Sequence, residues 1–323
     1  MPVMNSNARG ALMALLAFAI YATHDVVVKF LGALYSPVQI IFFSVLLSFP
    51  LVTLMLMGDR TDGNLRPRHP WWSLVRMVST VITGLSAFYA FSVLPLAQTY
   101  AILFAAPLLI TILAIPVLGE KVGIRRGLAV VVGLIGVLIV LRPGQADLAL
   151  GHLAALTAAV FSSLASVIVR KIGSEERSAV LVLYPMVANF IVLGLALPFV
   201  YQPMPIEHIG MLGIIASFGF VAMLLVIGAY RSAEAVIVAP MQYSQIIWAA
   251  IYGAIFFGES IDLYTAIGTI VIIASGIYIV LREGGGKVET KRPVLESRSR
   301  HETGTTPRIS LLLSRTAARE VGE

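Results

Sequence analysis

The sequence contains no cysteine and few charged residues, since Lys, Arg, Asp and Glu together make up only 12% of it. Without cysteine there are no disulfides and there is no thiol chemistry. A chain with 58% hydrophobic residues and a mean hydropathy of +0.91 cannot be solvated as an ordinary globular surface. The composition therefore predicts an integral membrane protein.

Several catalytic and processing signals are also missing. The sequence has no HExxH or GxSxG motif, and the run at 284–287 lacks the Walker spacing and the Ser or Thr that follows it. An intramembrane hydrolase and a nucleotide-driven pump are therefore not supported, and we expect no catalytic residue, no metal and no cofactor. Only Arg9 precedes a first apolar run that is too long for a signal peptide, so this run should remain as the first helix.

Apolar runs of about 20 residues, enough to cross a hydrocarbon core of ~30 Å as a helix, divide the chain. A barrel would need shorter segments that alternate apolar and polar residues, whereas 128–141 is apolar all round. We therefore expect an all-α integral membrane protein with ten transmembrane helices. They are predicted at 11–32, 37–57, 72–93, 98–118, 125–141, 150–170, 178–200, 210–230, 236–257 and 263–281.

The ten segments fall into two related halves of five. The first segment of each half carries the repeat most clearly, because 10–29 aligns without a gap with 151–170. This alignment places Lys29 on Arg170. An odd number of segments gives the two halves opposite orientations in the membrane, so they are inverted copies. The repeat predicts alternating access, in which the two halves rock around a site near the midplane.

Two further coincidences support the repeat. The Gly-Glu pair at 119–120, which ends the fourth segment, aligns with the pair at 258–259, which ends the ninth. GVLIVLR at 136–142 aligns with GIYIVLR at 276–282 after a one-residue insertion. Shared apolar composition alone would give some matches, so the Gly, Glu and Arg positions carry the most weight. We expect a cytoplasmic N-terminus, two five-helix repeats and a disordered, basic cytoplasmic tail, at 1–10, 11–144, 150–282 and 283–323 respectively.

Positive charge is unevenly distributed between the two sides of the predicted membrane. Most Lys and Arg residues between the segments fall on the side of the N-terminus and the basic tail, and only Lys29 and Arg142 lie at the opposite ends. Cytoplasmic loops retain positive charge, so we expect both termini in the cytoplasm and the chain in the cell inner membrane. The formal charge of +6 comes from this bias and from the tail, and no nucleic-acid partner is expected.

Asp25 is the only acid deep within a predicted span. A carboxylate there is costly, so function is the default hypothesis. Tyr21, Asp25 and Lys29 are spaced four residues apart and form one stripe on the first helix. Two interpretations stay open: a substrate or proton site in which Asp25 binds Lys29 and a ligand in turn, or a structural Asp25–Lys29 pair. His24 lies on another face, and a single His is more often a packing or hydrogen-bonding residue.

Arg76 is predicted about one turn inside the cytoplasmic end of the third segment. It could bind an anionic group of a substrate or form an inner gate, or it could extend to the lipid headgroups. Asp25 and Arg76 should differ in depth by about 10 Å, so a direct pair between them is not expected.

The ninth segment carries an uncommonly polar patch, PMQYSQ at 240–245. Pro240 removes one intrahelical hydrogen bond and leaves a carbonyl free for a ligand or a neighbour. Gln242 and Gln245 are suited to holding a polar, uncharged ligand edge, and Tyr243 offers a stacking face with a hydroxyl. Alternatively, these side chains join neighbouring helices by hydrogen bonds.

Glu120 and Glu259 end the fourth and ninth segments, one on each side of the membrane. Acids at helix C-termini oppose the helix dipole. Their symmetric presence therefore suggests a structural role in loop capping or a role in gating.

The duplicated ten-segment plan, the Gly-Glu pairs and the VLR endings of the fifth and tenth segments resemble the drug/metabolite transporter superfamily, specifically its EamA-type proteins. The resemblance covers residues 10–282. It implies a secondary carrier of the inner membrane, with a central cavity lined mainly by the first, third, fourth, sixth, eighth and ninth helices. A small-molecule substrate and the lipid bilayer are then the expected partners, and a homodimer is left open.

The first segment lacks the Trp-Gly pair of many EamA-type amino-acid exporters and has Asp25 followed by Lys29 instead. This pattern is more similar to the branch of S-adenosylmethionine and riboflavin carriers. The runs FAIYATHDVVVKFLG and APMQYSQIIWA are most similar to the proteobacterial riboflavin transporters, which implies riboflavin uptake. Uptake of S-adenosylmethionine and export of amino acids, metabolites or drugs are the alternatives, and a non-transporting structural or signalling membrane protein is a remote one.

Overall fold

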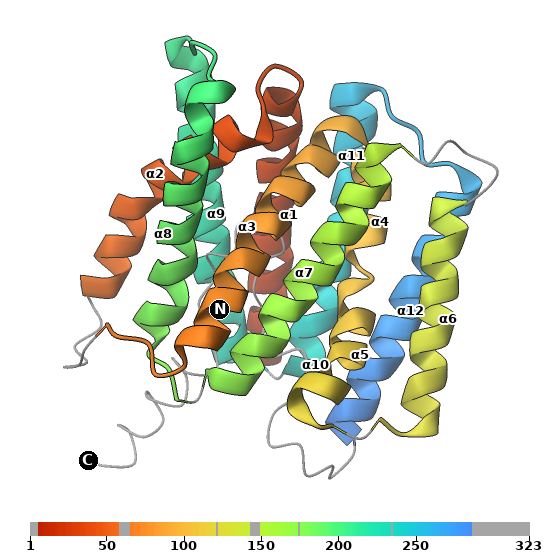
Figure 1. The fold of residues 1–323 in the computed structure, drawn as a ribbon. Helices are drawn as coiled ribbons and strands as arrows, with labels where there is room; N and C mark the ends of the chain where they lie inside the picture. Colours follow the sequence, from red (N-terminus) through yellow and green to blue (C-terminus); the bar gives the residue numbers. More distant parts are fainter. Residues whose placement is uncertain are drawn as a thin grey trace, which may run out of the picture.

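The computed structural model describes residues 6–57, 65–120, 122–142, 149–173, 175–233 and 235–285. In these residues all regular structure is helical, which confirms the predicted fold class (Figure 1). The first half contains α1 (Ser6–Gly32), α2 (Pro37–Met57), α3 (Pro70–Val93), α4 (Leu96–Leu103), α5 (Ala106–Leu118) and α6 (Ile124–Leu141). The second half contains α7 (Leu150–Ile172), α8 (Ser178–Ala196), the 3-10 turn η1 (Leu197–Phe199), α9 (Ile206–Ser232), α10 (Ala235–Val238), the 3-10 turn η2 (Ala239–Tyr243), α11 (Ser244–Phe257) and α12 (Leu263–Gly285).

The ten predicted spans all correspond to helical crossings. Within the described part of the chain, nine helical segments are long and apolar enough to cross a membrane, with α4 and α5 together forming one of them. The tenth crossing consists of α10, η2 and α11 in succession. Most of the disordered tail that we predict lies outside the described residues.

The fourth and ninth crossings are interrupted at equivalent points. α4 and α5 meet at Phe104, and η2 meets α11 at Tyr243, which the repeat aligns with Phe104. Pro107 and Pro240 begin α5 and η2. Each lacks the N–H that a continuous helix needs, so the helix cannot pass through unbroken. The interruption near Pro240 lies where the sequence predicts the loss of an intrahelical hydrogen bond, and the predicted span 98–118 contains the turn between α4 and α5.

The two halves are interleaved. The first helix of each half packs on the third helix of the other half, so that α1 lies against α9 and α7 against α3. The last helices of the halves, α6 and α12, pack together along one edge of the molecule, and α2 and α8 lie toward the opposite edge (Figure 1). Because the main contacts join one half to the other, the sequence halves are not separate bodies in this structure.

The backbones of α6 and α12 come close together at Gly136 and Gly268. A Cβ added at Gly136 would lie 2.9 Å from the carbonyl oxygen of Gly268, and this backbone atom cannot rotate away as a side chain can. We therefore expect Gly136→Ala to destabilise the protein by about 1–3 kcal/mol. Gly127→Ala, on the same helix but with no atom within 4 Å of the new Cβ, is the control and should not destabilise it. Equal melting temperatures of the two variants in detergent would contradict the close approach.

Candidate functional site

Asp25 is fully buried in α1, and its two carboxylate oxygens bind different partners. Oδ1 lies 2.7 Å from Nδ1 of His24, and Oδ2 accepts a hydrogen bond from the hydroxyl of Tyr100 on α4. That hydroxyl also accepts a hydrogen bond from Nε2 of Gln245 on α11, at 3.3 Å. We call His24, Asp25, Tyr100 and Gln245 the Asp25 network. Because buried hydrogen bonds strengthen one another in a low dielectric, the network fixes α1 to helices of both halves.

Lys29 pairs with Glu259 and not with Asp25, so a structural Asp25–Lys29 pair is wrong, whereas a substrate or proton site at Asp25 stays a prediction. Its Nζ lies 2.5 Å from Oε1 of Glu259 and also donates to the carbonyl oxygen of Leu94. The second oxygen of Glu259 accepts a hydrogen bond from the N–H of Leu96, at 2.9 Å. Lys29 lies one turn nearer the end of α1 than Asp25, and from there its long side chain reaches the residues that follow α11.

A second ion pair occupies the position that the repeat relates to the first. Nη2 of Arg170 on α7, which aligns with Lys29, lies 2.5 Å from Oε1 of Glu120, which aligns with Glu259. The Arg170 and Glu120 side chains are only 6% and 11% exposed. In each pair, a base on the first helix of one half binds the acid that follows the fourth crossing of the other half. The ion pairs therefore join the two halves at opposite ends of the bundle.

The Gly-Glu sequence places each acid for this contact. Gly119 and Gly258 end their helices in the left-handed conformation, with φ of 71° and 64°, which glycine adopts without strain. The next N–H then binds a carbonyl six residues back, at 3.4 Å for Glu120 and 2.9 Å for Glu259. The predicted capping role thus belongs to the backbone of this turn, and the carboxylates are left to bind other helices.

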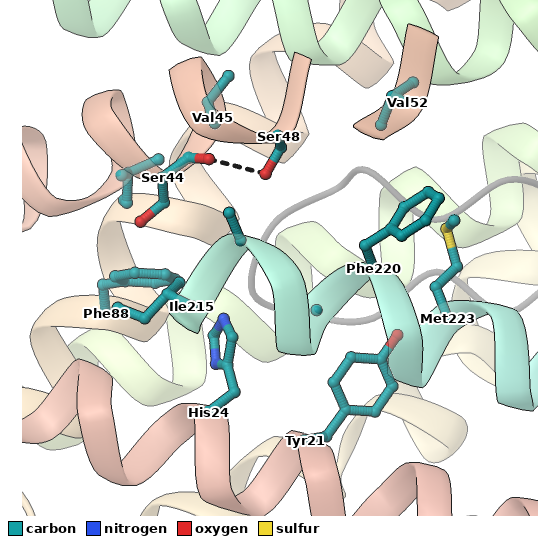
Figure 2. Close-up of a pocket in the computed structure, with 13 residues that line it drawn as sticks. Tyr21, His24, Ser44, Val45, Ser48, Val52, Phe88, Ile215, Phe220 and Met223 are labelled. Carbon is teal, nitrogen blue, oxygen red and sulfur yellow. Dashed lines mark hydrogen bonds between the residues drawn. The ribbon is translucent and has the colours of Figure 1, made fainter. Parts of the chain in front are cut away.

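A small cavity lies beside the Asp25 network, between α1, α2, α3 and α9 (Figure 2). Tyr21 and His24 line it from α1. Ser48 donates to the carbonyl of Ser44 at 2.7 Å, whereas the buried hydroxyl of Ser44 has no partner among the described residues. The remaining lining is apolar and includes Val45, Val52, Phe88, Ile215, Phe220 and Met223.

The cavity has a volume of about 40 Å³, which admits a few water molecules but not a metabolite. His24 lines it and also binds Asp25 through Nδ1, so this side chain connects the cavity with the Asp25 network.

The polar side chains of the ninth crossing contact different residues of neighbouring helices. Tyr243 packs edge-on against Phe104, with ring centroids 5.1 Å apart, and its hydroxyl fills the space where a side chain at Gly276 would lie. Gln245 belongs to the Asp25 network, while Gln242 is half-buried. Tyr243 therefore packs between helices.

Arg76 lies apart from these residues. It is 3% exposed, so it does not extend to the lipid, and its Nη1 donates to the carbonyl oxygen of Leu181 on α8 at 2.6 Å. Phe88, whose ring contacts that of His24 edge-on, lies twelve residues further along α3, or about 18 Å. Arg76 and Asp25 are thus separated in depth, as predicted.

The sequence pattern of the EamA-like transporter family matches residues 8–142 and again residues 149–282. The chain belongs to this family. It is 25% identical over 270 residues to the S-adenosylmethionine uptake transporter of Rickettsia prowazekii (strain Madrid E), covering 83% of this chain and 91% of that protein. It is also 25% identical over 270 residues to the pseudopaline exporter CntI of Pseudomonas aeruginosa (strain UCBPP-PA14), covering 83% and 94% respectively.

A crystal structure with 18% sequence identity matches the EamA-like chain with a TM-score of 0.57, over 87% of this chain and 99% of the other. This likeness concerns the fold alone. The family and the named relatives are transporters, which supports transport of a small metabolite across a membrane by this EamA-like protein.

Sequence reasoning did not anticipate two members of the Asp25 network. From the sequence, His24 is placed on another face than Asp25, as a packing or hydrogen-bonding residue, and Tyr100 is not among the candidate site residues. The sequence does contain a signal for each: His24 adjoins the only deep acid, and Tyr100 ends the polar run Gln98-Thr99-Tyr100 at the start of the fourth crossing. Neither signal identifies the partner, which depends on how α1, α4 and α11 are rotated against one another.

Proposed function

We propose that this EamA-like protein takes up a small heterocyclic metabolite across the inner membrane by alternating access. The observation that carries the proposal is the presence of two ion pairs related by the repeat, Lys29–Glu259 and Arg170–Glu120, at opposite ends of the bundle. A carrier of this kind needs a gate at each end, because one side must close before the other opens. Both pairs are formed and the cavity is small, which is consistent with a conformation closed at both ends.

The distribution of Lys and Arg supports an orientation with both termini in the cytoplasm. In this orientation Lys29–Glu259 is the outer gate and Arg170–Glu120 the inner gate. The chain needs no catalytic group for this function, and we propose no enzymatic activity.

Opening one side requires one ion pair to separate while the other stays formed. The helix pairs α1/α9 and α3/α7 each combine helices from both halves, so we take these pairs, and not the halves, as the moving units. Outer opening moves the end of α1 away from the end of α11, and inner opening moves the end of α7 away from the end of α5. The Asp25 network joins α1 to α4 and α11 between the two gates, where a substrate that binds Asp25 would weaken these links.

The substrate candidates come from two observations. The residues of the first and ninth crossings resemble those of riboflavin transporters, and Tyr21, Gln242 and Gln245 can bind a planar heterocycle with a polar edge. The relatives named as S-adenosylmethionine uptake transporters favour a second candidate, which is also a heterocycle but carries charged groups. Asp25 can bind a cationic group of such a molecule.

Uptake measurements in cells distinguish riboflavin from S-adenosylmethionine as the substrate. A bacterium that can neither synthesise nor import riboflavin is expected to accumulate the labelled vitamin and to grow at low external concentration only when it expresses this protein. Labelled S-adenosylmethionine is tested in parallel, with the empty vector as control. Uptake of neither compound despite confirmed membrane insertion would contradict the proposed uptake, and faster loss of a preloaded compound would indicate export.

A further inference from the structure

Arg76 carries a charge that has no acid to balance it among the described residues. Among the described residues its guanidinium makes one hydrogen bond, to the carbonyl oxygen of Leu181, and its buried Nε has no partner there. Arginine stays protonated in proteins, and a buried charge is normally paired because leaving water costs several kcal/mol. A guanidinium held by one neutral carbonyl in a membrane helix is therefore poorly compensated.

Ser73 repeats this pattern one turn earlier on the same face of α3. Its side chain is 6% exposed, and its buried hydroxyl has no hydrogen-bond partner in the part of the chain that the structure describes. Two acids, Glu175 and Glu176, lie in the loop before α8, and both bind His69 instead of Arg76. Glu175 contacts the His69 ring and Glu176 accepts a hydrogen bond from the His69 N–H, each at 2.7 Å. The Nε–H of Arg76 and the hydroxyl of Ser73 are thus neighbouring donors that have no acceptor among the described residues.

The same face of α3 stays polar toward the middle of the membrane. Thr80 and Thr83 follow Arg76 at helical spacing, and both are buried. Their hydroxyls donate to carbonyls of α3 itself and keep their oxygen atoms as acceptors. Five residues beyond Thr83, Phe88 lines the cavity beside the Asp25 network. A polar stripe therefore runs from Arg76 to Thr83, about five residues short of the cavity level at Phe88.

We propose that Arg76 and Ser73 form a subsite for an anionic group, a carboxylate or a phosphate, on the inner half of the transport path. The inference rests on the proposed transport function and specifies the class of substrate. The planar fork of the guanidinium can bind two oxygens of the anion, and the Ser73 hydroxyl can donate to one of them. The transported molecule is then a metabolite that carries a carboxylate or phosphate. S-adenosylmethionine has a carboxylate, whereas riboflavin has no ionised group at neutral pH.

Competition binding on the purified full-length protein tests the subsite. The protein is placed in nanodiscs of phosphatidylcholine, and labelled S-adenosylmethionine is displaced by the unlabelled compound or by its decarboxylated analogue. The wild type should bind S-adenosylmethionine at least about tenfold more tightly than the analogue, as expected for a charge-assisted contact. Arg76→Gln should remove this preference and leave the affinity for the analogue unchanged, because the analogue does not use the subsite.

Two further variants distinguish a direct effect of Arg76→Gln on anion binding from a general effect on the folded structure. Ser73→Ala is a milder change and should reduce the preference for the carboxylate only in part. Arg125→Gln removes a positive charge from the exposed start of α6 and should leave the preference intact. Equal loss of both ligands in Arg76→Gln, with an unchanged preference in Ser73→Ala, would overturn the subsite and give Arg76 a structural role.

Binding by the wild type and the effect of an anionic lipid also test the subsite. Equal wild-type affinity for the two compounds would overturn the subsite while transport of S-adenosylmethionine stands. Binding of riboflavin and not of S-adenosylmethionine would overturn the subsite and retain the proposed transport, whereas binding of neither would count against both. A preference that disappears when phosphatidylglycerol is added to the nanodiscs would assign Arg76 to a lipid headgroup and contradict a substrate subsite.

Discussion

Glu259→Gln is expected to lower substrate uptake about tenfold or more without reducing the amount of protein in the membrane. The amide keeps an oxygen that can accept the Leu96 N–H, but it removes the charge that binds Lys29. The outer gate then separates more easily, and a bias of about 1.4 kcal/mol toward the outward-open state is enough for a tenfold shift in the populations. Initial uptake rates, normalised to the protein detected in membranes, measure the effect.

Exchanging the two charges tests whether the pair itself matters. The double variant Lys29→Glu with Glu259→Lys should regain part of the activity that each single variant loses. Recovery is only partial, because a lysine at position 259 cannot accept the hydrogen bond from Leu96. Double variants no more active than the single ones would mean that the charges act separately.

The Arg142–Asp262 pair provides the matched control. It joins the ends of α6 and α12, which already pack together along the edge of the bundle. Burial would raise the pKa of Asp262, but hydrogen bonds from Thr265 and the charge of Arg142 lower it below its ordinary value, so the acid is ionised at neutral pH. Asp262→Asn therefore removes an ionised, ion-paired carboxylate, as Glu259→Gln does. Because this pair is not one of the two gates, uptake should stay near the wild-type rate.

Asp25→Asn is expected to abolish uptake and to leave insertion intact. Asparagine has the shape of aspartate but lacks its charge, and its amide nitrogen cannot accept a hydrogen bond from Tyr100 or His24. If the carboxylate binds the substrate and also links α1 to α4, the variant loses substrate binding and the link between the helices at the same time. Uptake of labelled substrate is compared with that of Tyr100→Phe, which keeps the carboxylate and should retain part of the activity.

Ser166→Ala is the control for this prediction. Ser166 occupies the position in α7 that the repeat relates to Asp25, and its hydroxyl binds the carbonyl of Ser162 in its own helix at 2.8 Å. We expect little change in uptake, since only one half carries the acid. Normal uptake by well-expressed Asp25→Asn would reassign Asp25 to a purely structural network.

The crossings could be predicted to within about five residues because long apolar runs determine them. The second predicted span, for example, matches α2 at both ends, 37 and 57. The partners of charged side chains could not be predicted in the same way. Lys29 at helical spacing from Asp25 suggests a local pair, and nothing local shows that Glu259, 230 residues later in the chain, competes for it.

The repeat alignment contains part of the missing information. It places Lys29 on Arg170 and Glu120 on Glu259, so that each half has one base and one acid at equivalent positions. Two inverted copies related by symmetry must use these residues in equivalent ways, and the structure shows that they pair across the halves. The Tyr100 and Gln245 contacts have no such signal, because their repeat counterparts are not a matching polar pair and their geometry depends on helix rotation.

Distances between spin labels at the two ends of the bundle test alternating access most directly, and the absence of cysteine makes specific labelling straightforward. One label pair, at Leu34→Cys and Ile261→Cys, reports on the outer end. The other, at Glu175→Cys and Ile124→Cys, reports on the inner end, and all four positions are exposed. Adding substrate, or introducing Glu259→Gln, should lengthen one distance while the other shortens or stays fixed. Two distances that never change, or that lengthen together, would contradict gates that open in turn.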